Sequence, residues 1–269
     1  MYEILKKQKI AEHTYMLQIK APEISKKLQP GNFIIIRIND KGERIPLTPA
    51  EYDKRTITLV FKEVGKTTQE LAKLKKRDSL QDVVGPLGNP VEIKKIGNLC
   101  LVAGGVGIAP IYNHAKELKK AGNKITIIAG AQSKKLLFWE DKLKKFADHL
   151  FICTDDGTKG EKGFVTDVLK KLIRTKKLNF VLAIGPLVMM KAVADLTRSR
   201  VRTFVSLNPI MVDGIGMCGS CRVLINNKVK FACVDGPGFD AHTVNFNDLL
   251  NRNNRFFEEE EMVCNCKEV

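Results

Sequence analysis

The chain has 269 residues, of which 44% are hydrophobic, and its net charge is +15. This length allows two compact domains, or three if one is small, and the hydrophobic content excludes a largely disordered chain. The longest apolar stretch, residues 99–112, contains three glycines and a proline and is too short for a membrane helix. The start of the chain lacks the apolar region of a signal peptide, so we expect a cytoplasmic protein with no membrane segment.

The positive charge comes from pairs of basic residues along the whole chain, such as Lys6-Lys7 and Lys170-Lys171. They alternate with apolar residues at helical spacing, which is typical of solvated helix faces. Nucleic-acid binding is not expected, because aromatic residues make up only 7% of the chain. The charge is compatible with attraction to an acidic protein partner.

Residues 1–94 predict a small antiparallel β-barrel. Strand-like runs occupy residues 15–20, 33–38 and 56–61, and one helix is expected over residues 67–75. Glycine and proline turns separate these short strands, which is typical of a barrel.

Residues 95–200 predict an α/β domain. Buried-strand runs at residues 98–103, 124–129, 150–154 and 180–185 alternate with helical stretches. One stretch follows Gly104-Gly105 and runs to residue 120, and two more cover residues 137–146 and 166–173. Such alternation indicates a parallel sheet with helices on both faces. The pattern ends near Val201, so residues 201–269 are expected to form a small third segment rich in glycine and cysteine.

A glycine-rich loop follows the first strand of this α/β domain, with Gly104, Gly105 and Gly107 ahead of Pro110. Glycines let a backbone approach phosphate, and the helix N-terminus supplies free N–H groups, although such glycines also occur in simple tight turns. The pattern is not the standard Rossmann fingerprint, because no acidic residue ends the second strand. Loops over residues 154–157, which include Asp155, and over residues 185–190, which begin with Gly185-Pro186, follow other strands of the same sheet, and three loops on one edge favour a cofactor site.

The barrel has two phosphate-type motifs, residues 44–48 (Arg-Ile-Pro-Leu-Thr) and residues 65–68 (Gly-Lys-Thr-Thr). An arginine on a strand can bind a pyrophosphate with two hydrogen bonds, and residues 65–68 precede a helix. The alternative is that Thr67 only caps that helix, with Glu70 three residues further on. A P-loop is excluded, because Val60 stands where its first glycine belongs.

The third motif is Asp213-x4-Cys218-x2-Cys221-x11-Cys233. Plant-type 2Fe–2S loops have the spacing C-x4-C-x2-C with a distant fourth cysteine, so the last three positions fit and an aspartate takes the first. Glycines within the loop give it the freedom to wrap a cluster. The alternative is a zinc ion bound by Cys218, Cys221, Cys264 and Cys266, which leaves Cys233 unused. Cys100 and Cys153 lie inside strands and are interpreted as core residues.

Together these motifs resemble the ferredoxin–NADP reductase superfamily over nearly the whole chain. The cluster segment resembles that of the electron-transfer subunit of dihydroorotate dehydrogenase. A closer resemblance is to the small subunits of NADH-dependent reduced ferredoxin:NADP oxidoreductase, also called sulfide dehydrogenase. It is carried by residues 43–48, 64–68, 211–221 and 231–236, while Gly238 departs from the usual acidic residue of that family.

The resemblance implies FAD, a 2Fe–2S cluster and NAD(H) or NADP(H) as cofactors. It implies a larger flavin and iron–sulfur subunit as partner in a heterodimer that carries out electron-bifurcating ferredoxin:NAD(P) oxidoreduction. Ferredoxin would be reached through that subunit. The alternative is the electron-transfer subunit of dihydroorotate dehydrogenase. The FAD would contact Arg44, Pro46, Leu47, Thr48, Gly65, Lys66, Thr67 and Thr68. The dinucleotide would contact Gly104, Gly105, Gly107, Asp155, Gly185 and Pro186, and the cluster ligands would be Asp213, Cys218, Cys221 and Cys233.

Overall fold

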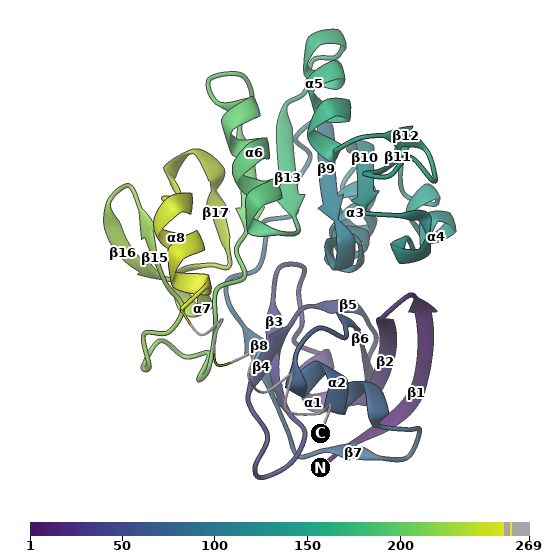
Figure 1. Ribbon diagram of the computed structural model, residues 1–269, viewed down its shortest axis with the longest axis vertical. Helices are drawn as coiled ribbons and strands as arrows, with labels where there is room; N and C mark the ends of the chain where they lie inside the picture. Colours follow the sequence, from purple (N-terminus) through teal and green to yellow (C-terminus); the bar gives the residue numbers. More distant parts are fainter. Residues whose placement is uncertain (256–258, 260–269) are drawn as a thin grey trace.

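The computed structural model describes residues 1–255 and 259, and it shows three parts (Figure 1). The N-terminal part is a barrel built from two antiparallel sheets. The larger sheet has the order β5 (Pro49–Tyr52), β6 (Thr56–Lys62), β2 (Thr14–Lys20), β1 (Tyr2–Ala11) and β7 (Ser79–Leu80). The smaller sheet has the order β4 (Ile45–Leu47), β3 (Phe33–Arg37) and β8 (Asp82–Leu87), and the helices are α1 (Pro22–Ser25) and α2 (Lys66–Lys73). The predicted barrel is confirmed.

Side-chain alternation along the strands builds the barrel core. Leu17 and Ile19 of β2 are fully buried, while Lys20 is exposed. In a strand, successive side chains point to opposite faces, so such residues line the interior. They pack against Ile57 and Leu59 of β6 in one apolar cluster.

The second part is a seven-stranded sheet in which the six strands other than β17 run parallel. Its order is β12 (Glu161–Lys162), β11 (His149–Thr154), β10 (Lys124–Ala131), β9 (Asn98–Gly104), β13 (Phe180–Ile184), β14 (Thr203–Ser206) and β17 (Gly238–Asp240). The helical elements are η1 (Gly105–Gly107), α3 (Ile108–Lys120), η2 (Lys134–Leu136), α4 (Glu140–Lys144), α5 (Val165–Thr175) and α6 (Leu187–Thr197). Apolar residues on both faces of β9 bury it between α3 on one side and α5 and α6 on the other.

The third part lies beside α6 and reaches down to the barrel (Figure 1). It contains a hairpin of β15 (Arg222–Ile225) and β16 (Lys228–Phe231), followed by α7 (Ala232–Asp235), η3 (Ala241–Thr243) and α8 (Phe246–Asn253). The strands β14 and β17 join the parallel sheet, so that sheet continues past residue 200, where we placed the boundary of the nucleotide domain. Within the described part of the chain, none of the helices is long and apolar enough to span a membrane.

Two local predictions differ from the structure. The helix expected over residues 137–146 is reduced to α4, because Trp139 has the left-handed φ of 58° and interrupts the regular backbone. The loop expected over residues 185–190 ends early, since α6 begins at Leu187 with Pro186 as its N-cap.

One continuous apolar core joins the three parts. It includes Phe33 and Ile35 of the barrel, Val181 of the parallel sheet, and the buried thiols Cys221 and Cys233 of the third part. The cysteine-bearing segment is therefore packed against both other parts at once.

Candidate functional site

The glycine-rich loops meet at the centre of the parallel sheet. From β9 the chain proceeds through β10 and β11 in one direction, and it then returns to β13 on the other side of β9. Ligands of open α/β sheets bind at such a switch point, outside the carboxyl ends of the strands. Gly104 ends β9 and Gly185 follows β13, so the structure brings two of the three predicted loops to this point.

Most of these glycines are required by close packing. A Cβ atom on Gly107 would lie 2.1 Å from the Ile184 carbonyl oxygen, and one on Gly104 would lie 2.5 Å from the Met189 sulfur. A Cβ on Gly185 would be 3.0 Å from the Gly104 Cα. The loop after β9 therefore touches the loop after β13 through backbone.

Gly105 differs from its neighbours. Its φ is 54°, which favours glycine, and a Cβ there would meet nothing within 4 Å. It begins the 3-10 turn that leads into α3, so its surroundings are open at a helix N-terminus. This is the arrangement expected where a phosphate approaches the backbone.

The third predicted loop lies further along the same edge. The Asp155 N–H donates to the Ala131 carbonyl at 3.1 Å, which ties the end of β11 to the end of β10. Burial raises the pKa of Asp155, and the charge of Asp156 raises it further. Nearby, the Lys134 N–H donates to the Thr158 hydroxyl at 2.8 Å.

The two phosphate-type motifs of the barrel lie close together. Arg44 immediately precedes β4, and the Thr67 hydroxyl at the start of α2 donates to the carboxylate of Glu43. Pro46 and Leu47 form β4 and Thr48 follows it. The guanidinium of Arg44 points toward the third part of the chain, since its Nε donates to the Val212 carbonyl at 2.9 Å.

The start of α2 is open where Gly65 lies. A Cβ on Gly65 would meet nothing within 4 Å, and Lys66 is exposed. The Thr68 hydroxyl accepts from the N–H groups of Val64 and Gly65, both at 3.0 Å, so the N-cap is Gly65, and Thr68, not Thr67, orders the start of the helix. The turn is thus ordered by the chain itself and remains accessible at Gly65.

The four predicted cluster ligands form two pairs. The Sγ atoms of Cys221 and Cys233 are 3.2 Å apart, and both residues are buried. Cys218 is exposed, and its thiol shares a side-chain hydrogen bond with the Asp213 carboxylate. In a 2Fe–2S cluster each iron takes two protein ligands, so this pairing fits a two-iron cluster.

The Asp213 carboxylate also orders the loop. It accepts the N–H groups of Ile215 at 2.9 Å, Met217 at 3.0 Å and Cys218 at 2.5 Å. Desolvation raises the pKa of Asp213, but these three backbone hydrogen bonds outweigh it, so the pKa lies below its usual value. The aspartate is therefore charged, as an iron ligand must be, while it also caps the loop.

The cysteine thiols have contrasting environments. Burial raises the pKa of Cys218, but backbone hydrogen bonds from Asp213 and Ser220 bring it below its ordinary value. Burial, followed by the neighbouring Cys221, raises the pKa of Cys233 to about 12. The raised pKa of the buried Cys233 next to the lowered pKa of the exposed Cys218 fits a site that a positive metal centre would complete.

The glycines of the loop allow its shape. Gly214, Gly216 and Gly219 have φ values of 77°, 85° and 69°, which side chains rarely adopt. Among the residues that the structure describes, no three His, Cys, Asp or Glu side chains meet at a single ion site. The zinc alternative includes Cys264 and Cys266, which lie outside the described residues. The assignment of Asp213, Cys218, Cys221 and Cys233 as ligands remains a prediction that their pairing supports.

One residue near this site gave no signal in the sequence. Asn89, in the turn after β8, donates from its side chain to the Val234 carbonyl at 3.0 Å. Its own N–H donates to the Gly236 carbonyl at 2.6 Å. In the sequence, Gly88-Asn89-Pro90 indicates only a turn.

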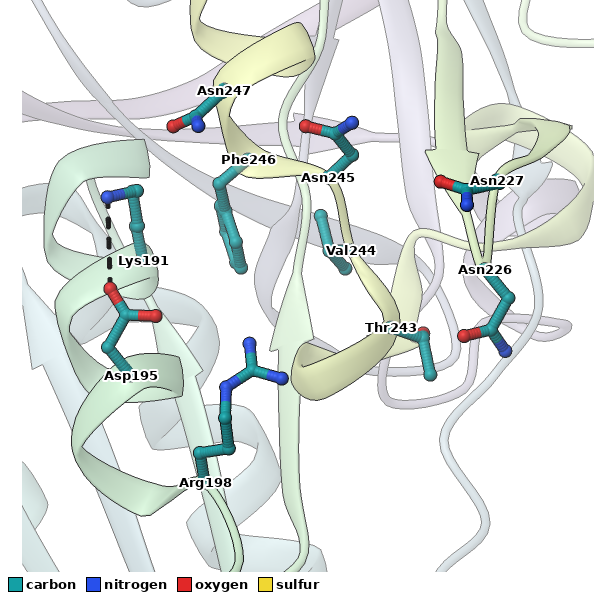
Figure 2. A pocket seen from close by; sticks show the side chains of 10 residues that line it. All are labelled: Lys191, Asp195, Arg198, Asn226, Asn227, Thr243, Val244, Asn245, Phe246 and Asn247. Atoms are coloured by element: carbon teal, nitrogen blue, oxygen red, sulfur yellow. Dashed lines mark ion pairs between the residues drawn. The ribbon is translucent and has the colours of Figure 1, made fainter.

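A polar cavity of about 500 Å³ lies elsewhere, between α6 and the third part of the chain. Figure 2 shows Lys191 and Asp195 on α6 facing the segment that carries Asn245 and Phe246. The Lys191 and Asp195 side chains pair with each other at 3.8 Å. None of the predicted cofactor or metal residues lines this cavity.

The fold and these sites define a reductase of the ferredoxin–NADP reductase type with an added iron–sulfur segment. Residues 101–195 match the oxidoreductase NAD-binding domain family, and residues 208–245 match the iron–sulfur cluster binding domain of dihydroorotate dehydrogenase B. The chain is therefore an oxidoreductase subunit that carries both domains.

The chain belongs to the family of dihydroorotate dehydrogenase B electron transfer subunits and their homologues. It is 49% identical to such a homologue from Thermotoga maritima, over 97% of this chain and 93% of the relative. It is 36% identical to the electron transfer subunit from Fusobacterium nucleatum, over 87% of this chain and 94% of the relative.

Two solved structures are also similar to this chain. A chain of the NADH-dependent reduced ferredoxin-NADP oxidoreductase structure, described as giving insights into flavin-based electron bifurcation, is 47% identical with a TM-score of 0.94. The match covers 100% of this chain and 98% of that chain. Phthalate dioxygenase reductase is 16% identical with a TM-score of 0.61, over 83% of this chain and 85% of that chain, which shows a shared fold alone.

Proposed function

We propose that this chain passes electrons between NAD(H) or NADP(H), FAD and a 2Fe–2S cluster as the smaller subunit of an electron-bifurcating ferredoxin:NAD(P) oxidoreductase. The observation that carries the proposal is that one apolar core joins β9 and β13, the strands that end at the open dinucleotide edge, to the buried thiols Cys221 and Cys233, and that these thiols lie 3.2 Å apart. The similarity over the full length to the bifurcating oxidoreductase chain supports it.

The residues of the chain have separate tasks in this proposal. The open backbone at Gly105 and the Gly185-Pro186 loop would bind and orient the dinucleotide at the switch point. Arg44 and residues 65–68 would bind the two phosphates of FAD. When bound, flavin supplies hydride acceptance from nicotinamide, and the cluster supplies exchange of single electrons. The protein contributes mainly by placing these groups.

The visible spectrum of the purified chain tests the cofactor content. We expect flavin bands together with the broad shoulder of an iron–sulfur cluster, and FAD, not FMN, in the heat extract. Arg44→Ala should lose flavin on gel filtration and keep its iron, because the arginine would bind the pyrophosphate and is not itself one of the predicted cluster ligands. A colourless protein, or full flavin retention in the variant, would contradict this account.

A second candidate function is electron transfer to a dihydroorotate dehydrogenase. The match of residues 208–245 to the cluster-binding domain of that enzyme favours it, as do the names of the relatives. Asp213 argues for the first candidate, because the resemblance to the bifurcating family includes an aspartate at this position. Copurification of a dihydroorotate-oxidising subunit with this chain would decide for the second candidate.

The proposed partner is a larger flavin and iron–sulfur subunit that docks over the cluster loop, and ferredoxin would react with that subunit. Four apolar side chains, which we call the apolar rim, belong to the cluster loop or follow Cys233 in the chain, and they are exposed by 42–83%: Val212, Ile215, Met217 and Val234. Exposed apolar clusters of this kind mark protein interaction sites.

Because exposed thiolate ligands survive in reducing compartments, we also propose a cytoplasmic location.

The apolar rim provides a test of the partner. Met217→Lys should reduce copurification of the larger subunit, since it places a charge where an apolar contact is expected. Phe164→Lys is the matched control, because Phe164 is 62% exposed on the nucleotide domain, away from the loop. Equal copurification of the larger subunit with both variants would show that the apolar rim is not part of the interface. Rapid ferredoxin reduction by the isolated chain with NADH would contradict the need for the partner.

A further inference from the structure

The barrel holds the cluster segment at two backbone carbonyl groups. The Arg44 Nε donates to the Val212 carbonyl at 2.9 Å, and the Asn89 side chain donates to the Val234 carbonyl at 3.0 Å. Val212 immediately precedes Asp213, and Val234 immediately follows Cys233. Each hydrogen bond therefore fixes the backbone within one residue of a predicted cluster ligand, one in each ligand pair.

Close packing reinforces these two hydrogen bonds. A Cβ on Gly214 would lie 2.6 Å from Ile35 Cδ1 and 2.7 Å from Leu87 Cδ1, so the loop backbone rests directly on the barrel. On the other side, a Cβ on Gly88 would lie 2.8 Å from the Pro237 ring. The segment thus contacts the barrel on both sides of the ligand set.

The two hydrogen bonds come from the domain that would bind the flavin. Arg44 precedes β4, and Asn89 follows β8, which are the two neighbours of β3 in the smaller barrel sheet. A displacement of the cluster relative to the flavin would have to break one of these bonds. Since single-electron transfer depends steeply on the distance between donor and acceptor, their geometry bears directly on its rate.

We propose that Asn89 is a positioning residue for internal electron transfer, acting with Arg44 to fix the distance between the flavin and the cluster. This inference rests on the proposed function, because it presumes that both groups are bound. Asn89 is the cleaner of the two to test. Arg44 has its remaining guanidinium nitrogens free for the flavin phosphates, so its removal would disturb flavin binding as well.

The experiment compares Asn89→Asp, Asn89→Ala and Asn98→Ala in the full chain with its flavin and cluster. Asp has the shape of Asn, but its carboxylate cannot donate and would repel the Val234 carbonyl. The bond from the Asn89 main-chain N–H to Gly236 is kept in both variants at this position. Asn98 is the matched control, because its exposed side chain likewise donates to a distant carbonyl, that of Lys177 at 3.1 Å, far from the cluster loop.

Two quantities are measured: the magnetic coupling between one-electron-reduced flavin and reduced cluster by EPR, and the rate of cluster reduction after rapid mixing with NADH. We expect unchanged flavin and iron content in every variant. In Asn89→Asp the coupling should weaken, or its EPR signal should broaden, and the rate of cluster reduction should fall several-fold. Both changes should be smaller in Asn89→Ala, and neither should occur in Asn98→Ala.

Unchanged coupling and rate in Asn89→Asp would overturn the positioning role, and so would an equal loss in Asn98→Ala. Should Asn89→Asp fail to fold, Asn89→Ala provides the same comparison. Absence of flavin and cluster from the unmodified chain would instead overturn the proposed function, so the two failures are distinguishable.

Discussion

The nucleotide edge and the cluster loop are two sites built by different physical means. At the nucleotide edge, backbone packs on backbone: Gly107 lies against Ile184, and Gly104 lies against Gly185. At the cluster loop, by contrast, side chains provide the chemistry and hydrogen bonds to Asp213 provide the shape. The first site is complete without its ligand, whereas the second leaves two ligand pairs for a metal centre to join.

Because of this difference, substitutions should damage the two sites in different ways. A site made by backbone contact should fail through folding when a single methyl group is added, because there is no side chain to move aside. A site made by ligand side chains should fail through loss of its metal while the fold persists, since packing contributes little there.

Gly107→Ala should have the largest effect. The new Cβ would stand 2.1 Å from the Ile184 carbonyl oxygen, so the junction of β9 and β13 must open, at a cost of about 3 kcal/mol. Chemical denaturation should show this loss, together with loss of dinucleotide binding. Gly65→Ala is the contrast, because its Cβ would meet nothing within 4 Å. We expect its stability to change by less than about 0.5 kcal/mol, with weaker flavin binding. Equal stability of the two variants would contradict the packing argument.

Substitutions of two buried cysteines should have effects of intermediate size. Cys221→Ala should abolish the cluster absorbance, because it removes one of the two predicted ligands in the buried pair. Cys100→Ala should keep the cluster and cost about 1 kcal/mol of stability, since Cys100 is a core residue of β9. Burial raises the pKa of Cys100 to about 12, so it remains a neutral thiol. Iron content and thermal unfolding distinguish the outcomes, and cluster loss in Cys100→Ala would refute the assignment.

A small effect is expected from Asp148, an aspartate that accepts hydrogen bonds for structure alone. The Lys119 ammonium donates to its two oxygens at 2.6 and 2.7 Å, and the Ile125 N–H donates at 2.7 Å. These bonds, with that from Lys119 the largest, lower the pKa of Asp148 below its unfolded value. The stabilisation is therefore fully present above a pH of about 4, the unfolded pKa, and is lost as pH falls through the lower folded pKa.

Asp148→Asn should accordingly reduce stability near neutral pH by up to about 1 kcal/mol, a discounted value because the side chain is 37% exposed. The difference from the unmodified chain should disappear in acid. Urea unfolding at both pH values measures it. Asp141→Asn serves as control, since Asp141 is 96% exposed and should show no such change. A constant difference at all pH values would exclude the linkage.

Much of the fold could be predicted from the sequence, because local patterns of residues indicate where its strands, helices and turns lie. Strand-like runs between turns predicted β2, β3 and β6, and glycine after a buried run predicted the loop between β9 and α3. The left-handed Trp139, the helix beginning at Leu187 and the strands β14 and β17 escaped prediction. The strand β17 pairs with β14 at the edge of the parallel sheet, a tertiary contact that short local patterns do not encode.

The candidate sites were predicted as motifs but not as geometry. Spacing alone indicated Asp213, Cys218, Cys221 and Cys233, yet it did not reveal that they divide into two pairs. It also gave no indication that Arg44 and Asn89 reach residues 168 and 145 positions away. Long-range contacts of this kind depend on how the barrel and the third segment pack, which no local pattern encodes.

The EPR spectrum of Asp213 variants is the most direct test of the central claim, that one carboxylate and three thiols bind the cluster. Asp213→Cys should keep a 2Fe–2S cluster with altered g-values and potential, because thiolate replaces a carboxylate of equal charge. Asp213→Ala should make the cluster labile, whereas Cys264→Ser and Cys266→Ser should leave it intact. An unchanged spectrum in Asp213→Ala, or loss of the cluster in either tail variant, would contradict the claim.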